Sequence, residues 1–79
     1  MKPKEIPQDH QELMIEIGKR LRELRKSKDM SYIEFAKKIG ISRNSYNQME
    51  LGISNFQFIS LKVVLQEHGI RLEDFFKGL

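Results

Sequence analysis

Four side chains between positions 43 and 48 carry the hydrogen-bonding groups that read the edges of base pairs. Arg43 has a guanidinium, and Asn44, Asn47 and Gln48 have carboxamides. A guanidinium matches the O6 and N7 acceptors of guanine, and a carboxamide matches the N6 donor and the N7 acceptor of adenine. On a helix, where each residue advances about 100°, the four positions share an outer arc roughly 140° wide. The arc has no acidic residue and suits hydrogen bonding in the major groove of duplex DNA. A solvated helix face would show the same polar pattern, and spacing alone leaves both interpretations open.

The sequence predicts a short helix just before these residues. Ser31 is a favourable N-cap residue, and Glu34 three positions later completes a capping box. Phe35, Ala36 and Ile39 then share one apolar helical face. This helix is expected to begin at Ser31 and to end near Ile39.

A glycine turn separates it from the helix that carries the polar arc. Gly40 can adopt the left-handed conformation that closes a helix, so that the next helix leaves at a steep angle. Ser42 caps that second helix, whose inner side carries Tyr46 and Met49, and Gly52 is placed to end it. This is the helix-turn-helix layout of duplex DNA readers.

The stretch SYIEFAKKIGISRNSYNQMELG, from Ser31 to Gly52, resembles the helix-turn-helix of the Xre/Cro-type, lambda repressor-like transcriptional regulators. Every position of the family's pattern is filled: Ser31, Phe35, Ala36, Gly40, Ile41, Ser42, Tyr46, Met49, Glu50 and Gly52. The resemblance covers roughly residues 16 to 76. It implies an all-α, five-helix domain whose second and third helices form the helix-turn-helix, with a recognition helix over residues 42–51.

The resemblance also implies roles for single residues. The base contacts would come from Arg43, Asn44, Asn47 and Gln48. The backbone phosphates would be held near helix N-termini and in the loop after helix three, by Ser31, Tyr32, Ser42, Ser45, Ser54 and Asn55. In the family, an Arg late in helix one pairs with the Glu that ends the recognition helix. The matching residues, Arg25 and Glu50, are expected to form a structural ion pair.

The chain departs from the family's pattern at three positions. His68 precedes Gly69 where a Leu is usual, and Leu65 stands where a small residue is common. Ile33 occupies the third position of helix two, where polar residues are usual. The packing around helix four is therefore expected to differ from that of the family.

Length and charge fit one compact module that binds a polyanion. The chain has 79 residues, a formal net charge of +3 and no cysteine. A chain of this size buries only about 60% of its unfolded surface, enough for one small core. Residues 19–28 hold six bases and the single acid Glu23. Such a segment can neutralise DNA phosphates, although solvated lysines and arginines are equally ordinary on a protein surface.

The chain is expected to consist of a flexible arm, residues 1–8, and one domain, residues 9–79. Pro3 and Pro7 favour an unstructured arm, and helix one is predicted to begin near Asp9. No segment approaches the roughly 18 apolar residues of a membrane span, and the first ten residues lack the hydrophobic segment of a signal peptide. We therefore expect a cytoplasmic protein without membrane contact. No cluster of catalytic or metal-binding residues can be drawn, so neither an enzyme nor a cofactor or metal is predicted.

The segment ISNFQFISL after Gly52 holds more large apolar side chains than one side of a short helix can bury. Some of them must face outward or face another chain. Because twofold dimers are the commonest assemblies and this family usually meets palindromic half-sites, we predict a homodimer with Ile53 and Phe56 among its contacts. In the alternative, both residues tuck under the loop after helix three.

These observations together predict a small transcriptional regulator, a repressor, that binds a palindromic double-stranded DNA operator as a dimer. The rival hypothesis is an antitoxin-like or other interaction module whose main partner is a protein. In that case the apolar surface near Phe56 or the arm would carry the contact.

Overall fold

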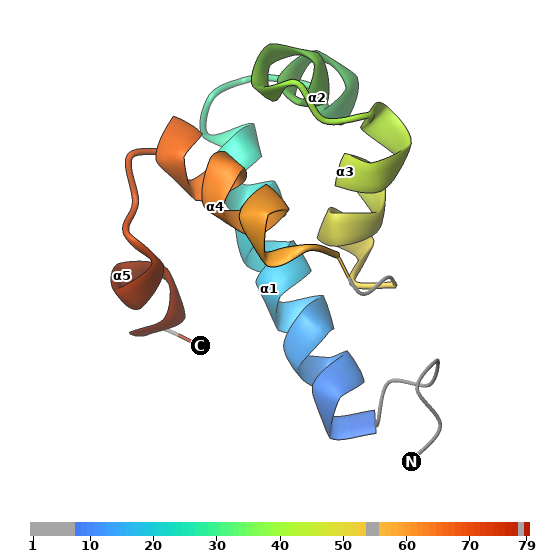
Figure 1. The fold of residues 1–79 in the computed structure, drawn as a ribbon, viewed down its shortest axis with the longest axis vertical. Coiled ribbons are helices and arrows are strands. Elements are labelled where there is room, and N and C mark those ends of the chain that lie inside the picture. Colours follow the sequence, from blue (N-terminus) through green and yellow to red (C-terminus); the bar gives the residue numbers. More distant parts are fainter. Residues whose placement is uncertain (1–7, 54–55, 78) are drawn as a thin grey trace.

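The computed structural model describes residues 8–53, 56–77 and 79, which form five helices (Figure 1). Their bounds are α1, Gln8–Lys26; α2, Tyr32–Ile39; α3, Arg43–Leu51; α4, Phe58–Glu67; and α5, Leu72–Lys77. The predicted all-α, five-helix architecture is confirmed. Helix α1 begins at Gln8 and so takes in one residue of the expected arm, the rest of which lies outside the described residues.

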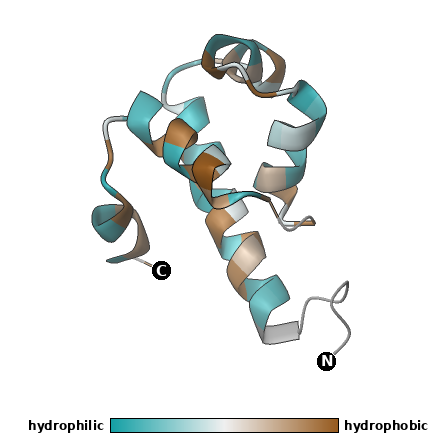
Figure 2. Cartoon of the chain, viewed as in Figure 1, coloured by the Kyte–Doolittle hydropathy of each residue, from teal (hydrophilic) through white to brown (hydrophobic). Residues whose placement is uncertain are grey.

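The long helix α1 supports the other elements. Helix α3 packs against α1, α2 contacts both α3 and α4, and α5 contacts α4. The N-terminal turns of α1 project beyond the other helices (Figure 1). Apolar and polar residues alternate around the helices (Figure 2), and each helix contributes to one core. The buried core residues are Ile17, Leu21, Phe35, Ala36, Tyr46, Met49, Leu61, Val64, Leu65 and Phe75.

Helices α1 and α3 approach so closely that backbone lies against backbone. A Cβ atom added to Gly18 would overlap the carbonyl oxygen of Glu50 and lie 2.6 Å from that of Met49. A Cβ on Gly52 would lie 2.7 Å from the Cα of Ile15, and Gly52 also has a left-handed φ of 67°. Both positions therefore require glycine, one for space and the other for space and backbone conformation.

A buried ion pair fastens the same two helices further along α1. Arg25 Nε donates to Glu50 Oε2 at 2.7 Å, and Arg25 Nη2 donates to Glu50 Oε1 at 2.9 Å. A third bond runs from Arg25 Nη1 to the carbonyl oxygen of Met30 at 2.8 Å. The two side chains are only 11% and 5% exposed. The hydrogen bonds that Arg25 donates to the Glu50 carboxylate raise the pKa of Arg25 above its ordinary value, so its guanidinium stays charged.

Helix α4 is joined to α2 by a ring stack and an ion pair. The His68 ring lies parallel to that of Phe35, with centroids 5.0 Å apart. Lys38 Nζ lies 3.0 Å from Glu67 Oε2 at the neighbouring edge. Among the helices of the described residues, none is long and apolar enough to cross a bilayer.

The close contact at Gly18 predicts that alanine at this position lowers the free energy of unfolding, the opposite of its usual effect in a helix. In most helix interiors, alanine in place of glycine gains about 1 kcal/mol. For Gly18→Ala we expect the free energy of unfolding to fall by about 1–3 kcal/mol, because the new methyl group pushes α3 away from α1. Urea denaturation followed by circular dichroism measures the change. Arg22→Ala, at an exposed position of α1, is the control and should change stability by less than about 0.5 kcal/mol. A Gly18→Ala variant as stable as the native protein would contradict the close contact.

Breaking the buried pair should cost more than breaking an exposed one. Glu50→Ala leaves the Arg25 guanidinium buried without its carboxylate, and we expect the free energy of unfolding to fall by about 3–5 kcal/mol. Glu16→Ala is the matched control, since it removes the exposed pair with Lys19, which is 3.7 Å long. That change should cost less than about 1 kcal/mol. Equal losses in the two variants would rule out a structural role for the buried pair.

Candidate nucleic-acid interface

The four residues proposed for base contacts lie on the outer side of α3. Arg43 and Asn44 are exposed in the first turn, and Asn47 and Gln48 are half-buried one turn later. None of the four side chains forms a hydrogen bond or ion pair with another described residue, which leaves their donors and acceptors available. Leu51, half exposed, falls within the same arc at the C-terminal end of the helix. The sequence-based description of that arc did not include it.

The inner side of α3 fixes the rotation of the helix. Tyr46 and Met49 are buried, and the Tyr46 ring packs on that of Phe35 with centroids 5.2 Å apart. The Tyr46 hydroxyl is buried without a hydrogen-bond partner among the described residues. Burial, followed by the Glu50 carboxylate, raises the pKa of Tyr46 far above its ordinary value, so the phenol stays neutral. With Glu50 held by Arg25, the inner side has no freedom to turn outward.

The two helix N-termini have the caps that the sequence predicted. Ser31 Oγ accepts from the Glu34 N–H and the Glu34 carboxylate accepts from the Ser31 N–H, both at 3.1 Å. Gly40 ends α2 with a left-handed φ of 76°. Ser42 Oγ accepts from the Ser45 N–H at 3.1 Å and donates to Ser45 Oγ at 2.8 Å. The Ser45 hydroxyl hydrogen therefore remains free for an outside acceptor.

The two N-termini differ in charge. Glu34 lies in the first turn of α2, and its bonds to Ser31 lower the pKa of its carboxyl group, which keeps it ionised. An anion that approaches the N-terminus of α2 meets the Glu34 carboxylate, which already accepts the hydrogen bond from the Ser31 N–H. The first turn of α3, residues 43–46, has no acidic residue and begins with Arg43. The N-terminus of α3 is therefore the better anion site of the two.

The six residues proposed for phosphate contacts differ in exposure, and two of them lie outside the described residues. Ser31, Ser42 and Ser45 are exposed, whereas Tyr32 is half-buried and packs against the core. Ser54 and Asn55 lie outside the described residues.

A groove of about 420 Å³ lies between α3 and the start of α4. Its polar lining comes from Ser45, Gln48, Gln57 and Ser60. Gln57 is the N-cap of α4, but its side-chain amide forms no capping hydrogen bond. Sequence reasoning missed Gln57 and Ser60, although two polar residues three positions apart at the start of a helix share one side of it, a signal that could have found them.

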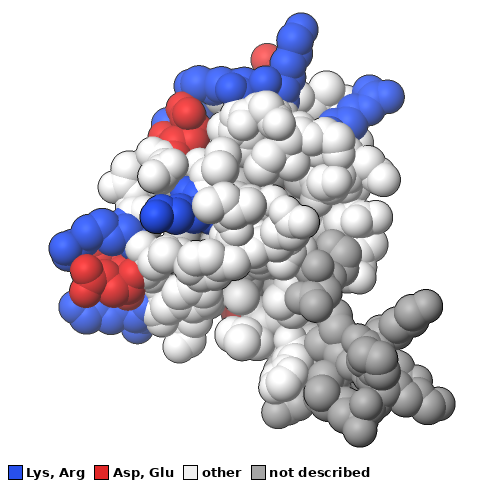
Figure 3. All heavy atoms as spheres, viewed as in Figure 1, with Lys and Arg blue, Asp and Glu red and all other residues white. Residues whose placement is uncertain are grey.

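Charge is distributed unevenly around this surface. Lysine and arginine side chains gather over α2, while the middle of the same face is largely uncharged (Figure 3). Lys37 and Lys38 in the last turn of α2 are exposed, and Arg43 follows at the start of α3. These cations lie at the junction of the two helices, where the chain turns.

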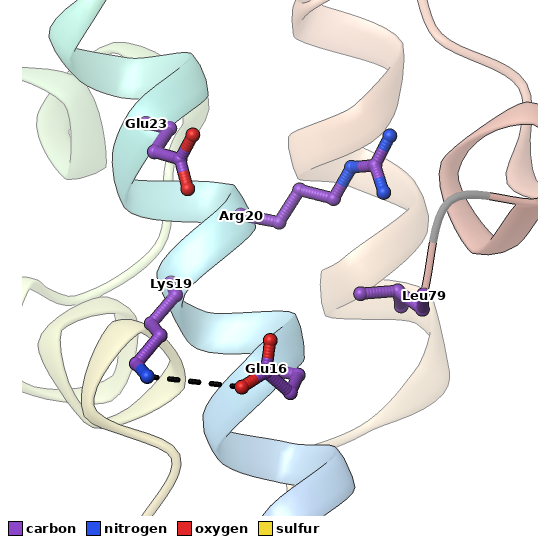
Figure 4. A pocket seen from close by; sticks show the side chains of 5 residues that line it. All are labelled: Glu16, Lys19, Arg20, Glu23 and Leu79. Carbon is purple, nitrogen blue, oxygen red and sulfur yellow. Dashed lines mark ion pairs between the residues drawn. The ribbon is translucent and has the colours of Figure 1, made fainter.

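A second hollow, about 300 Å³, lies on α1 away from these residues (Figure 4). Its lining combines two acids with two bases, and Glu16 and Lys19 pair with each other. Arg20 reaches toward the C-terminal part of the chain, where its guanidinium lies 5.6 Å from the ring centroid of Phe75. Because its charges are mixed, this hollow is not suited to a polyanion. No group of three or more potential metal ligands occurs in the described part of the chain.

Comparisons with known proteins show which family the chain resembles. The profile of the family described as Helix-turn-helix matches residues 21–75. The antitoxin PezA of Streptococcus pneumoniae is 36% identical over 58 residues, which are 73% of this chain but 37% of that protein. The chain thus spans little more than a third of the length of this curated relative.

A solved structure has the same arrangement of helices. The restriction-modification controller protein C.AhdI from Aeromonas hydrophila superposes with a TM-score of 0.75 and 27% sequence identity. The superposition covers 85% of this chain and 97% of the controller protein. With a family profile that matches well over half of its residues, the chain belongs to the helix-turn-helix family of DNA-binding transcriptional regulators.

Proposed function

We propose that the protein is a repressor that binds a palindromic double-stranded DNA operator as a homodimer, with α3 in the major groove. One observation carries this proposal: the outer side of α3 presents Arg43, Asn44, Asn47 and Gln48 without partners among the described residues, while its inner side is fixed to α1 and α2. Rigid presentation matters because a helix that is already fixed in place loses little further conformational freedom when its side chains meet base edges.

The proposed base contacts divide between two turns of α3. Arg43 and Asn44 extend from the N-terminal turn, which enters the groove first in this kind of complex. Asn47 and Gln48 are half-buried, so neighbouring atoms restrict their rotamers. Each bidentate contact of this type is worth about 1–3 kcal/mol of discrimination against the wrong base.

The proposed phosphate contacts surround the same helix. The N-terminus of α3 offers Ser42, Ser45 and a dipole that no acid in its first turn opposes. Gln57 and Ser60 line the groove between α3 and α4, and their side chains add hydrogen-bond donors there. Ser31, Tyr32, Ser54 and Asn55 complete the set as proposed from the sequence. These contacts would set the position of α3, and the base edges would set its preference.

The proposed dimer rests on apolar side chains after α3. Ile53 is 65% exposed, and Phe58 and Ile59 at the start of α4 are 63% and 59% exposed. Phe56 is half-buried and packs against the core. Only the exposed edge of its ring would contact the second protomer, whereas most of the Ile53 side chain would do so. Such a surface on a small monomer favours association. Two reading helices related by a twofold axis would lie about 34 Å apart, one turn of DNA.

A protein partner is the second candidate. The similarity to an antitoxin favours it, and the exposed apolar side chains at Ile53, Phe58 and Ile59 are equally suited to a different protein. In this candidate DNA binding is secondary, and a different protein that co-purifies with the chain would favour it over the first.

Removing single carboxamides should relax sequence preference without removing affinity for DNA in general. For Asn44→Ala and Gln48→Ala we expect a loss of about 1–3 kcal/mol on an operator selected from random duplexes, confined to one base position in each half-site. Fluorescence anisotropy on operators substituted at each position measures this. The slope of affinity against salt should stay unchanged, because neither variant removes a cation. Gln66→Ala on α4 is the control. A loss that is equal for all sequences would reassign these residues to backbone contacts.

A charge placed in the apolar surface should dissociate the dimer. We expect Ile53→Asp to sediment as a monomer at concentrations where the native protein is a dimer, with unchanged helix content, because a carboxylate would be buried at the interface. Ile33→Asp, an exposed apolar position on α2, should remain dimeric. Native protein that is monomeric at high micromolar concentration and binds a palindrome without cooperativity would remove the dimer from the proposal.

A further inference from the structure

His68 occupies an unusual place for a titratable residue. It ends α4, and its ring lies against Phe35 of α2 at a centroid distance of 5.0 Å and an interplanar angle of 14°. On its other side, Phe35 packs on Tyr46 of α3 at 5.2 Å. Three rings therefore connect α4, α2 and α3 in series. Any change at His68 acts on the residue that supports the inner side of α3.

The surroundings of the His68 ring disfavour a second proton. Its Nε2 atom is buried and has no hydrogen-bond partner among the described residues. A neutral imidazole tolerates this, because one nitrogen carries a hydrogen and the other is a bare acceptor. An imidazolium carries a hydrogen on both nitrogens, so protonation would bury a charged donor without an acceptor.

The charged groups that face His68 come from three parts of the chain. Lys28, between α1 and α2, and Lys38, on α2, both oppose a positive ring, whereas Glu67, on α4, favours it. The Glu67 carboxylate lies 3.0 Å from Lys38 Nζ, and burial together with the two lysines outweighs its effect on the ring. Burial is the main cause that lowers the pKa of His68 below its ordinary value, and the two lysines act in the same direction.

We propose that His68 is a pH-sensitive positioning residue: its neutral ring holds Phe35 and thereby α2 and α3 in place, and its protonation loosens this stack and weakens DNA binding. The part that concerns DNA rests on the function proposed above. The part that concerns folding does not.

The direction of the pH effect follows from the two protonation equilibria. The unfolded chain binds a proton at His68 with a pKa of about 6.5, and the folded chain binds it less readily. The stabilisation is therefore complete above about pH 6.5 and is lost as the pH falls below it. The folding equilibrium constant falls by up to tenfold for each unit by which folding depresses the pKa. Ordinary carboxylates titrate near pH 4, so histidine is the ordinary side chain that titrates between pH 7.5 and 5.5.

The first experiment uses the fact that the chain has only two histidines, His10 and His68. Urea denaturation is measured at pH 7.5 and 5.5 for the native protein, for His68→Leu and for His10→Gln. The native protein and His10→Gln should both lose stability at the lower pH, whereas His68→Leu should keep the same urea midpoint. A midpoint of His68→Leu that falls as far as that of the native protein would overturn the proposal.

A second measurement keeps the test decisive if His68→Leu does not fold. Nuclear magnetic resonance of the native protein follows the His68 ring through the same pH range. The ring should titrate with a midpoint below 6.5, and the ring resonances of Phe35 and Tyr46 should shift with the same midpoint. A midpoint at or above 6.5, or aromatic signals that ignore the titration, would overturn the proposal.

A third measurement tests the link to DNA. Affinity for a selected operator is compared at pH 7.5 and 5.5 at constant ionic strength. The native protein and His10→Gln should lose several-fold more affinity at the lower pH than His68→Leu loses. Equal losses in all three proteins would overturn the link to DNA. An absence of duplex binding at either pH would instead overturn the proposed function, and the urea midpoints would still decide the role of His68 in folding.

Discussion

The direct contact between the backbones of α1 and α3 is the constraint on which the rest of this structure depends. Glycines at positions 18 and 52 let the two helices meet without side chains between them, and the Arg25–Glu50 pair then fixes α3 at a third point along α1. Three points determine both the tilt and the rotation of a rod. The polar outer side of α3 is therefore presented in one orientation, with Tyr46 and Met49 as the buried counterpart. A buried ion pair is weak evidence for stability in itself, but here its geometry gives it a clear role in orientation.

Local chemistry made much of this fold predictable. Capping at Ser31 and Ser42 and left-handed glycines at 40 and 52 depend on residues within a few positions of one another, and these ends appear where the sequence placed them. The resemblance to a known family supplied the long-range Arg25–Glu50 pair. The contact made by Gly18 was not predicted, because a glycine within a helix signals only a propensity cost until its neighbour on another helix is known. The stack of His68 on Phe35 was missed for the same reason.

The start of α4 shows where pattern reasoning reaches its limit. The sequence predicted that some apolar residues after Gly52 face outward or face another chain. Helical periodicity and composition did not show which of them are exposed and which are buried. Phe56 packs against the core, whereas Ile53, Phe58 and Ile59 are exposed. Contact with the core, which the spacing of apolar residues does not reveal, distinguishes the Phe56 ring from that of Phe58. The same holds for Gln57 and Ser60, which line the groove beside α3 because α4 begins there.

The separation of duties around α3 has a consequence for how such proteins diversify. Residues that hold the helix and residues that would meet a base pair occupy opposite sides, and substitutions without shared partners have nearly additive effects. Substitutions at positions 43, 44, 47 and 48 should therefore leave the glycine contacts and the Arg25–Glu50 pair undisturbed. The scaffold is in this sense evolvable: a lineage that keeps the glycines and the buried pair can exchange the outer side chains of α3, the ones proposed for base contacts, without rebuilding the frame that holds them.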